Sequence, residues 1–265
     1  VGGGVDPARI GQRVWTYNVN RTADGLGQGA IGTAAELVAV RAAQAVPLPE
    51  GTGFVEAAAL GVPAMTAQAA LLTDGPINGM SVLVTGGAGA VGSLAIQMAK
   101  WAGATRIVTT VSSDAKAQVA MADGADAAVN YRELGIGDEL RDALLDANGG
   151  RKFDRMVDVD FGSYINLSAQ VLHHGAVIGT YASMSEPKPT VDFYPLMMNN
   201  ITIRLVEVYA QSPARFAEIC AGVNRALEDG ALTPRMDSTY ALAETFSAHE
   251  RVESGGQLGN VIVEI

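Results

Sequence analysis

The sequence is poor in cysteine, histidine and long apolar runs. Cys220 is the only cysteine among 265 residues, so the chain cannot form an internal disulfide, and this is typical of proteins from reducing compartments. No run of about 18 or more apolar residues occurs, and no segment has the basic, apolar and small-residue regions of a signal peptide. We therefore expect no membrane partner and a cytoplasmic location.

Positive charge is also scarce. Lysine and arginine together number 18 against 28 aspartates and glutamates, which gives a formal net charge of −10. This charge repels nucleic acids and anionic lipids, and no block of basic residues offsets it locally. We therefore expect no nucleic-acid partner. With 48% hydrophobic residues, the chain can bury a large core in one long or two modest globular domains.

Two common catalytic sets are missing. Catalytic zinc is held by cysteine, histidine and carboxylate side chains, but this chain has one cysteine and three histidines. Adjacent helical positions point about 100° apart, so we interpret His173 and His174 as a solvated helix end, and His249 and Cys220 as packing or surface residues. None of the seven tyrosines is followed by lysine four positions later. This excludes the Tyr-x-x-x-Lys pair of short-chain reductases, and we expect no metal site.

A glycine-rich turn is the strongest positive signal. The motif G-x-G-x-x-G at 87–92 follows the β-branched segment Val82–Thr85 and opens the helical pattern Gly89–Trp101. In this context the glycines permit a tight turn, and the free N–H groups at the helix start accept a pyrophosphate, whereas the alternative is a merely glycine-rich surface turn. We assign the pyrophosphate to Gly86, Gly87, Ala88, Gly89, Ala90, Val91 and Gly92.

Strand and helix patterns alternate around this motif. The predicted strands are Val82–Thr85, Ile107–Val111, Ala127–Asn130, Arg155–Val159, Ala176–Thr180 and Ile201–Tyr209. The predicted helices are Ala57–Leu72, Gly89–Trp101, Asp114–Ala122, Asp138–Ala147, Leu167–Leu172 and Ser212–Glu228. This alternation predicts the α/β class, with a doubly wound parallel sheet covered by helices on both faces.

The two ends of the chain do not show the alternation of strand and helix patterns. Up to about Pro49, short apolar segments at 13–17 and 34–40 are broken by glycine and asparagine, and Ser238–Leu242 and Val261–Ile265 resemble strands that rejoin this part. We therefore predict a smaller β-rich domain at 1–60 and 232–265, and a dinucleotide-binding domain at 61–231. The chain has no initiator methionine and begins as a turn leading into a strand, so we expect further residues of this domain before Val1.

The end of the second strand bears on the choice of dinucleotide. An NAD site usually has an acid there, but Ile107–Ser112 offers none, and Ser112, Ser113 and Lys116 suit a ribose 2′-phosphate. NADPH is therefore favoured. In the alternative, one of the two serines caps the next helix and Lys116 is solvated, while the nearby Asp114 keeps NADH open. Tyr131 either bonds the same phosphate or borders the adenine.

The ordered motifs resemble the zinc-free medium-chain dehydrogenase/reductase superfamily, in particular its quinone oxidoreductase (zeta-crystallin-like) branch. The resemblance runs through essentially the whole chain and rests on Gly11–Val14, Ala57–Thr66, Gly86–Gly92, Ser113-x-x-Lys116, Val129–Tyr131, Gly175–Gly179 and Ala248–Gly259. It implies a Rossmann-type sheet with a smaller GroES-like substrate domain that is N-terminally incomplete. It further implies about 60 to 75 residues before Val1, including a tyrosine that some relatives use as proton donor.

The resemblance also implies roles for individual residues. Thr66 would contact the nicotinamide carboxamide, although a helix hydroxyl bonded to its own backbone is the simpler interpretation without the family pattern. Gly179, Thr180 and Tyr181 would border the nicotinamide, and Ser113, Lys116 and Tyr131 would surround the 2′-phosphate. Thr66 and Tyr181 are the pocket candidates, and no catalytic residue is assigned.

These features predict an NADPH-dependent reductase that transfers hydride to a quinone or an α,β-unsaturated carbonyl compound without metal, because such substrates delocalise the developing charge. The alternatives are an enoyl-thioester reductase of the same fold and an NADPH-binding protein with little turnover. The segment Ile201–Tyr209 should form a sheet edge, and in this family such a strand commonly pairs with its copy. We therefore expect a homodimer.

Overall fold

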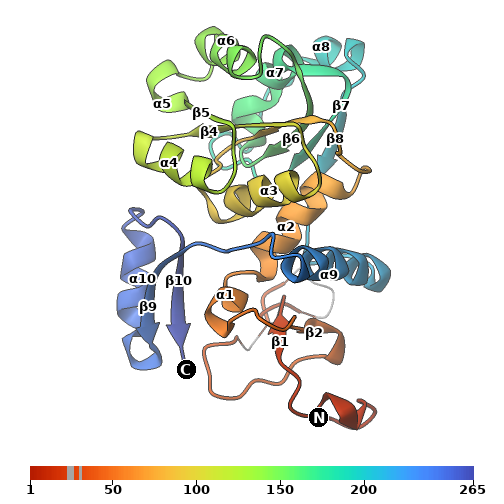
Figure 1. The fold of residues 1–265 in the computed structure, drawn as a ribbon, viewed down its shortest axis with the longest axis vertical. Coiled ribbons are helices and arrows are strands. Elements are labelled where there is room, and N and C mark those ends of the chain that lie inside the picture. Colours follow the sequence, from red (N-terminus) through yellow and green to blue (C-terminus); the bar gives the residue numbers. More distant parts are fainter. Residues whose placement is uncertain (23–26, 30–31) are drawn as a thin grey trace. The chain divides into compact units, whose positions relative to one another are not determined.

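The computed structural model describes residues 1–22, 27–29 and 32–265 (Figure 1). It divides into two compact units, of which the larger is Thr66–Glu207 and the smaller combines Val1–Met65 with Val208–Ile265. The division that we predict from the sequence lies at 60/61 and 231/232 instead. The larger shift has a physical cause, because the helix after position 212 packs within the smaller unit, as described below.

The larger unit is built on a six-stranded parallel sheet with the order β5-β4-β3-β6-β7-β8. From β3 the chain winds outward to one edge, then returns beside β3 and winds to the other edge, which is the doubly wound order of dinucleotide-binding sheets. The strands are β3 (Ser81–Val84), β4 (Arg106–Val111), β5 (Ala127–Asn130), β6 (Phe153–Asp158), β7 (Leu172–Thr180) and β8 (Thr202–Leu205). The predicted α/β class is confirmed.

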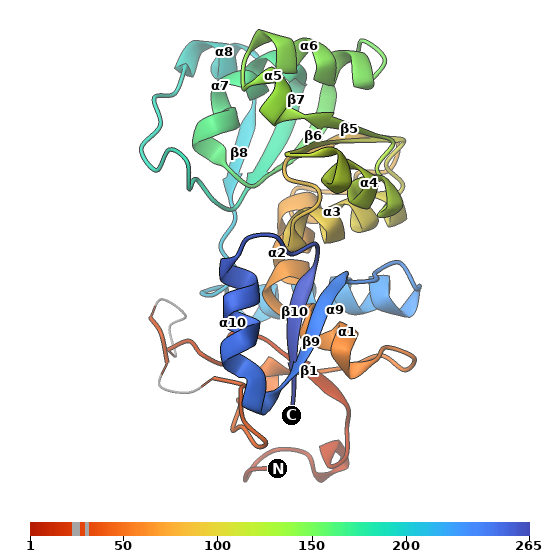
Figure 2. The ribbon, with the colours of Figure 1, turned by 90° about the vertical axis from the view of Figure 1, so that its left-hand side faces the viewer.

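Helices cover both faces of this sheet. In Figures 1 and 2, α3 and α4 lie on one side of the sheet and α6 and α7 on the other. The helices are α2 (Gly61–Leu72), α3 (Ala90–Trp101), α4 (Asp114–Ala122), α5 (Tyr131–Leu134), α6 (Asp138–Ala147), α7 (Phe161–Val171) and α8 (Phe193–Met198), of which α2 spans the boundary between the units. Within the described residues, no helix is long and apolar enough to cross a membrane.

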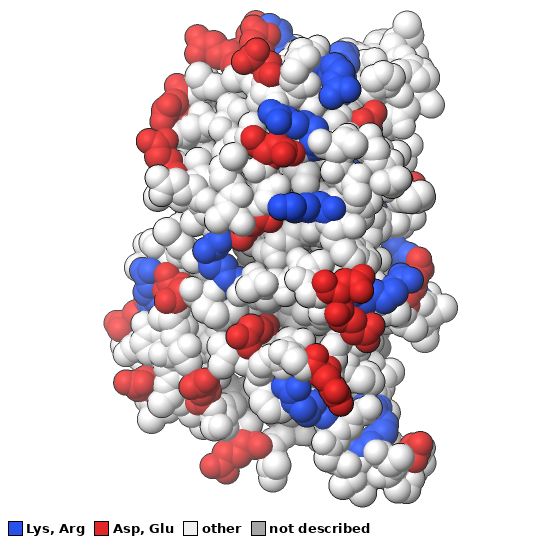
Figure 3. Space-filling view, viewed as in Figure 1, with Lys and Arg blue, Asp and Glu red and all other residues white. Residues whose placement is uncertain are grey.

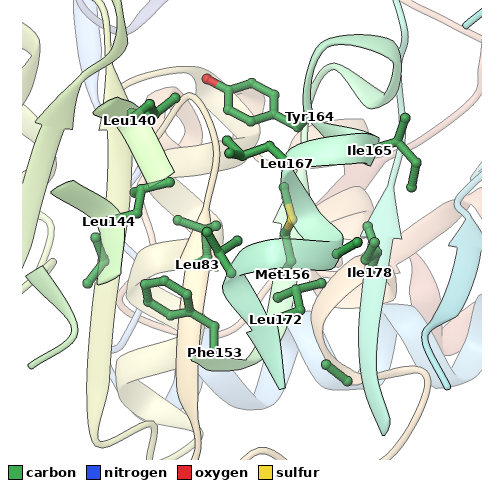
Figure 4. Packing of buried hydrophobic residues seen from close by; sticks show 14 of the residues in the cluster. Leu83, Leu140, Leu144, Phe153, Met156, Tyr164, Ile165, Leu167, Leu172 and Ile178 are labelled. Atoms are coloured by element: carbon green, nitrogen blue, oxygen red, sulfur yellow. The ribbon is translucent and has the colours of Figure 1, made fainter. Parts of the chain in front are cut away.

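The core of the larger unit lies between the sheet and the pair α6 and α7 (Figure 4). Leu83 and Met156 come from the central strands β3 and β6, and both are at most 1% exposed. Leu140 and Leu144 stand four residues apart on α6, so they share one helix face and are both fully buried. The opposite face of α6 is acidic, and Figure 3 shows acidic side chains gathered over α5 and α6.

The smaller unit contains two separate two-stranded sheets. Antiparallel β1 (Val14–Thr16) pairs with β2 (Ala45–Pro47), and parallel β9 (Met236–Ala241) pairs with β10 (Asn260–Glu264). Its helices are α1 (Phe54–Ala58), α9 (Pro213–Glu228) and α10 (Thr245–Glu253), with short 3₁₀ turns at Pro7–Arg9, Ala42–Gln44 and Leu242–Glu244.

Contacts with β1 explain why α9 belongs to the smaller unit. The buried Trp15 on β1 donates its indole N–H to Asn224 Oδ1 on α9 at 2.9 Å. The rings of Tyr17 and Phe216 lie 5.0 Å apart between their centroids. These partners are about 200 residues apart in the sequence, so local patterns could not reveal them.

Three local predictions differ from the structure. The helix predicted at Leu167–Leu172 is α7 and begins at Phe161, while His173 and His174 lie in β7 rather than at a helix end. Gly175, with φ of +79°, follows them at a register shift of β7, which breaks the regular strand pattern. The predicted strand Ile201–Tyr209 shortens to β8, because the chain leaves the larger unit after Glu207. The short apolar segment at 34–40 lies outside the strands and is mostly exposed.

We expect Met156→Ala to lower the free energy of unfolding of the larger unit by about 2–5 kcal/mol, because it opens a cavity beneath the central strands. Met121→Ala is the matched control, since Met121 is 44% exposed on α4, and it should cost less than about 0.5 kcal/mol. Urea unfolding followed by circular dichroism measures both variants. Equal midpoints for the two would contradict the placement of Met156 in the core.

Candidate cofactor site

The glycine turn joins β3 to α3 at the carboxyl edge of the sheet. Gly86 has φ of +67°, which glycine adopts without strain, and its N–H donates to Thr110 Oγ1 on β4 at 3.2 Å. The Gly89 N–H then donates to the Gly86 carbonyl oxygen at 2.9 Å. The turn is therefore fixed to the neighbouring strand before the helix begins at Ala90.

The turn and the helix approach each other very closely. A Cβ atom on Gly92 would lie 2.3 Å from the Gly86 carbonyl oxygen and 2.8 Å from Gly87 Cα. Both neighbours are backbone atoms that no side-chain rotation can move. Glycine at position 92 is therefore a condition for packing α3 against the turn, as the sequence motif predicts.

The start of α3 is open to a ligand. Gly89 occupies the N-cap position, and no side chain caps the first N–H groups of the helix. Gly89 and Ala90 are exposed, while Ala88 and Val91 are half-buried. Unpaired N–H groups at a helix N-terminus, together with the helix dipole, attract an anion such as a pyrophosphate. The residues present therefore fit the phosphate group that the motif predicts.

The end of β4 has one capping serine and one lysine without a described partner. Ser113 Oγ accepts a hydrogen bond from the Lys116 backbone N–H at 3.3 Å and caps α4. Of the two serines that could cap this helix, Ser113 is therefore the one that does. The Lys116 side chain is half-buried, and its ammonium makes no hydrogen bond or ion pair with a described residue. Ser112 is half-buried and Asp114 exposed. A cation therefore stands at this strand end.

Tyr131 lies at the end of the adjacent strand β5. It begins the short helix α5, whose N-cap Asn130 accepts a hydrogen bond from the Arg132 N–H at 3.1 Å. The Tyr131 side chain is half-buried and packs against the core cluster. Because β4 and β5 are parallel neighbours, Tyr131 follows the same edge of the sheet as Ser112 and Ser113.

A buried carboxylate connects three strand ends at the point where the strand order reverses. Asp158, at the end of β6, is 1% exposed and accepts hydrogen bonds from Thr85 Oγ1 at 2.8 Å and Thr180 Oγ1 at 2.9 Å. The Asp160 N–H donates to the same carboxylate at 3.2 Å. Burial raises the pKa of Asp158, while these hydrogen bonds oppose the shift. Asp158 therefore aligns β3, β6 and β7.

The segment at the end of β7 packs tightly against α2. A Cβ on Gly179 would lie 2.2 Å from the Ala70 carbonyl oxygen, so α2 reaches the strand backbone directly. The Tyr181 N–H donates to the Asp158 carbonyl oxygen at 3.1 Å. Burial, with a smaller contribution from the Asp158 charge, raises the pKa of Tyr181 well above its ordinary value, so its hydroxyl stays protonated at neutral pH.

Thr66 lies on α2, one turn before the contact with Gly179. Its side chain is 5% exposed, yet its hydroxyl makes no hydrogen bond with a described residue. The simple interpretation of Thr66 as a hydroxyl bonded to its own helix is therefore not what the structure has.

No sequence motif pointed to Thr85, Thr110, Asp158 or Tyr164. Tyr164 Oη lies 3.2 Å from Thr110 Oγ1, which also accepts the Gly86 N–H, so Tyr164 supports the glycine turn from α7. Thr85, Thr110 and Asp158 are polar residues near the ends of otherwise apolar strands, which marks their position but not their contacts, whereas Tyr164 lies on α7. Among the residues that the structure describes, no group of three or more histidine, cysteine, aspartate or glutamate side chains could hold a metal ion.

Residues 90–223 match the model of the zinc-binding dehydrogenase family. The chain is 28% identical over 220 residues to the quinone oxidoreductase of Pongo abelii, covering 82% of this chain and 64% of that protein. Against the quinone oxidoreductase of Rattus norvegicus the identity is 26%, covering 99% of this chain and 75% of that protein. The chain thus spans about two thirds of the length of these relatives.

Solved structures of related enzymes resemble this chain as well. The quinone oxidoreductase of Pseudomonas syringae pv. Tomato DC3000 superposes with a TM-score of 0.74 at 25% identity, covering 90% of this chain and 73% of that one. A 2-octenoyl-CoA carboxylase reductase in complex with NADP and 2-octenoyl-CoA has a TM-score of 0.72 at 32% identity, covering 84% of this chain and 52% of that one.

We expect Gly92→Ser to lower the free energy of unfolding by about 1–3 kcal/mol, because its Cβ forces α3 away from the turn. It should also weaken the binding of nicotinamide dinucleotides, since the helix N-terminus moves with α3. Gly137→Ser is the control, because a Cβ at this N-cap position meets open space. Thermal unfolding and calorimetric titration measure both variants, and unchanged dinucleotide affinity in Gly92→Ser would contradict the assignment.

Proposed function

Because the chain belongs to the zinc-binding dehydrogenase family, in the quinone oxidoreductase branch of the medium-chain dehydrogenase/reductase superfamily, we propose that it is an NADPH-dependent reductase of quinones or α,β-unsaturated carbonyl compounds. The observation that carries the proposal is the open helix N-terminus after Gly89, beside a strand end that has Lys116 and no acid from Ile107 to Ser113.

Each part of the dinucleotide has candidate partners in the larger unit. The turn at 86–92 would bind the pyrophosphate, and Ser112, Lys116 and Tyr131 would surround the 2′-phosphate. Thr66, with its unengaged hydroxyl, and the segment at 179–181 would orient the nicotinamide carboxamide. When bound, NADPH would supply a hydride to an electron-poor carbon of the substrate. Asp158 would act as a positioning residue, because it joins the strand ends that carry the turn and the segment at 179–181.

We further propose that the reaction needs no zinc, although the family description is zinc-binding. The sequence has one cysteine and three histidines, and the described residues hold no metal-ligand group. His173 and His174 are exposed on β7, and Cys220 is buried on α9. Quinones and enones suit such a site, because conjugation already spreads the negative charge that a Lewis acid would otherwise stabilise.

An enoyl-thioester reductase is the second candidate. It is favoured by the 32% identity to the 2-octenoyl-CoA carboxylase reductase that was solved with NADP and 2-octenoyl-CoA. The chemistry is similar, because a thioester carbonyl also activates the β-carbon toward hydride. The two candidates differ in whether the substrate carries a coenzyme A group.

NADPH oxidation by the full-length protein separates these candidates. We expect turnover of 1,4-benzoquinone, 9,10-phenanthrenequinone or a short enal that persists in the presence of a chelator. Preferred turnover of an enoyl thioester would instead promote the second candidate. Turnover of a primary alcohol with NADP⁺ alone, or activity lost to the chelator together with about one zinc per chain by elemental analysis, would contradict the proposal.

Lys116→Ala should weaken NADPH binding by about tenfold and leave NADH binding nearly unchanged, because a charge-assisted hydrogen bond to the 2′-phosphate contributes about 1.5 kcal/mol at a half-exposed site. Lys152→Ala removes an exposed lysine just before β6 and is the control. Calorimetric titration with both dinucleotides measures the effect. Equal losses for NADPH and NADH would show that Lys116 does not read the phosphate.

We also propose that the protein forms a homodimer through β8. This strand ends the sheet order, and its residues Ile203 and Leu205 are 36% and 74% exposed. Nearby on the sequence, α8 exposes Phe193, Tyr194, Met197 and Met198. An apolar sheet edge with unpaired backbone groups favours pairing with a second copy.

Leu205→Glu should convert the dimer into a monomer at micromolar protein concentration, because it would place a carboxylate from each copy in the apolar shared edge. Leu37→Glu is the control, since Leu37 is 92% exposed in the smaller unit. Multi-angle light scattering gives the mass of each variant. A wild-type protein that remains a monomer at every concentration would refute the dimer.

A further inference from the structure

The smaller unit contains a cavity of about 790 Å³ that the cofactor assignment does not use. It lies among β2, the segment after β1 and α9, and all its described lining residues belong to this unit. The rings of Tyr17, Tyr209 and Phe216 form part of its wall. Its volume falls in the range of about 300–1,000 Å³ that is usual for sites of small organic molecules.

The cavity is basic, although the chain is acidic. Arg9, Arg21 and Arg41 line it, whereas none of the described lining residues is an aspartate or glutamate. The whole chain, in contrast, has a formal net charge of −10. Arginine side chains produce a local positive potential that favours an anionic ligand where, as among the described lining residues, no acidic side chain stands beside them.

Neutral groups hold Arg9 in place. Its guanidinium donates to Gln12 Oε1 at 2.8 Å, to the Ala42 carbonyl oxygen at 2.9 Å and to the Ala45 carbonyl oxygen. Because these acceptors carry no net charge, the positive charge of Arg9 remains uncompensated by its hydrogen-bond partners. Arg9 therefore contributes to the potential of the cavity while it stays fixed.

Arg21 provides the contact group. Its guanidinium carbon lies 3.9 Å from the centroid of the Tyr209 ring, so the aromatic ring fixes the plane of the guanidinium. Arg21 makes no ion pair with a described residue, and its Nε is buried without an acceptor. Stacking occupies the face of the guanidinium, and the N–H groups at its edge remain for a carboxylate or sulfonate, which they match in geometry.

We propose that this cavity binds a flat organic anion, whose conjugated ring packs among the aromatic side chains and whose acidic group pairs with Arg21. Binding in this cavity involves the smaller unit alone and does not depend on hydride transfer. The ligand must combine an apolar ring with one negative charge, because either property alone would leave half of the lining unmatched.

Two ligands that differ in charge test the proposal. Anthraquinone-2-sulfonate and 2-(hydroxymethyl)anthraquinone have similar size, but only the sulfonate is charged. Calorimetric titration of the full chain without nucleotide should show tighter binding of the sulfonate. Arg21→Gln should weaken the sulfonate by about tenfold or more, as expected for a charge-assisted hydrogen bond, and the neutral analogue by less than about threefold.

Arg225→Gln is the matched control. Arg225 is exposed on α9 in the same unit and does not line the cavity, so its replacement should change neither affinity by more than about twofold. Weaker binding of both ligands by the same factor in Arg21→Gln would overturn the proposal, and so would failure of the wild-type chain to bind the sulfonate. NADPH oxidation is assayed separately. The binding result can therefore be interpreted even if the proposed reductase function is wrong.

Cys220 gives a second measurement that needs no variant. It is the only cysteine of the chain and lines the same cavity. Burial raises the pKa of its thiol to about 11, so alkylation at pH 8 is slow and can be followed by mass spectrometry. Saturating anthraquinone-2-sulfonate should slow this alkylation at least about fivefold if the ligand fills the cavity. An unchanged rate would count against the proposal.

Discussion

The burial of one carboxylate constrains the whole carboxyl edge of the sheet. A buried charge costs several kcal/mol unless hydrogen bonds compensate it. At Asp158, hydrogen bonds from Thr85, Thr180 and the Asp160 N–H offset this cost. These donors stand on three different segments. Because the carboxylate requires all of them, the glycine turn after β3 and the segment after β7 are held at the same edge.

Much of the larger unit follows from the sequence, because buried parallel strands read as apolar runs and the helices between them are periodic. The glycine turn was predictable for a stronger reason, since Gly92 stands where only hydrogen fits beside the Gly86 carbonyl. The packing of α9 in the smaller unit was not predictable, because it depends on the contact of Trp15 with Asn224, which are far apart in the sequence. The prediction placed His173 and His174 at a helix end and not in β7, because the irregularity at Gly175 interrupts the strand pattern.

The sequence predicted the residues that would contact the cofactor, but not the residues that hold them in place. Ser113 illustrates the difficulty, because a serine at a strand end serves equally as a helix cap or as a phosphate ligand, and here it caps α4. Asp158 carries no local sign of its burial, since an acid at the end of a strand is more often solvated. Only the strand order, which brings Thr85 and Thr180 to its two oxygens, reveals its role.

The protonation of Tyr181 bears on which substrates such a site can serve. Burial raises the pKa of Tyr181, so this residue keeps its proton at neutral pH and would offer a neutral O–H donor rather than a charge. A neutral donor stabilises a developing oxyanion less than a metal ion does. Under the proposed function, the substrate itself must therefore spread the charge. Conjugated acceptors meet this requirement, whereas an isolated ketone leaves the charge on one oxygen.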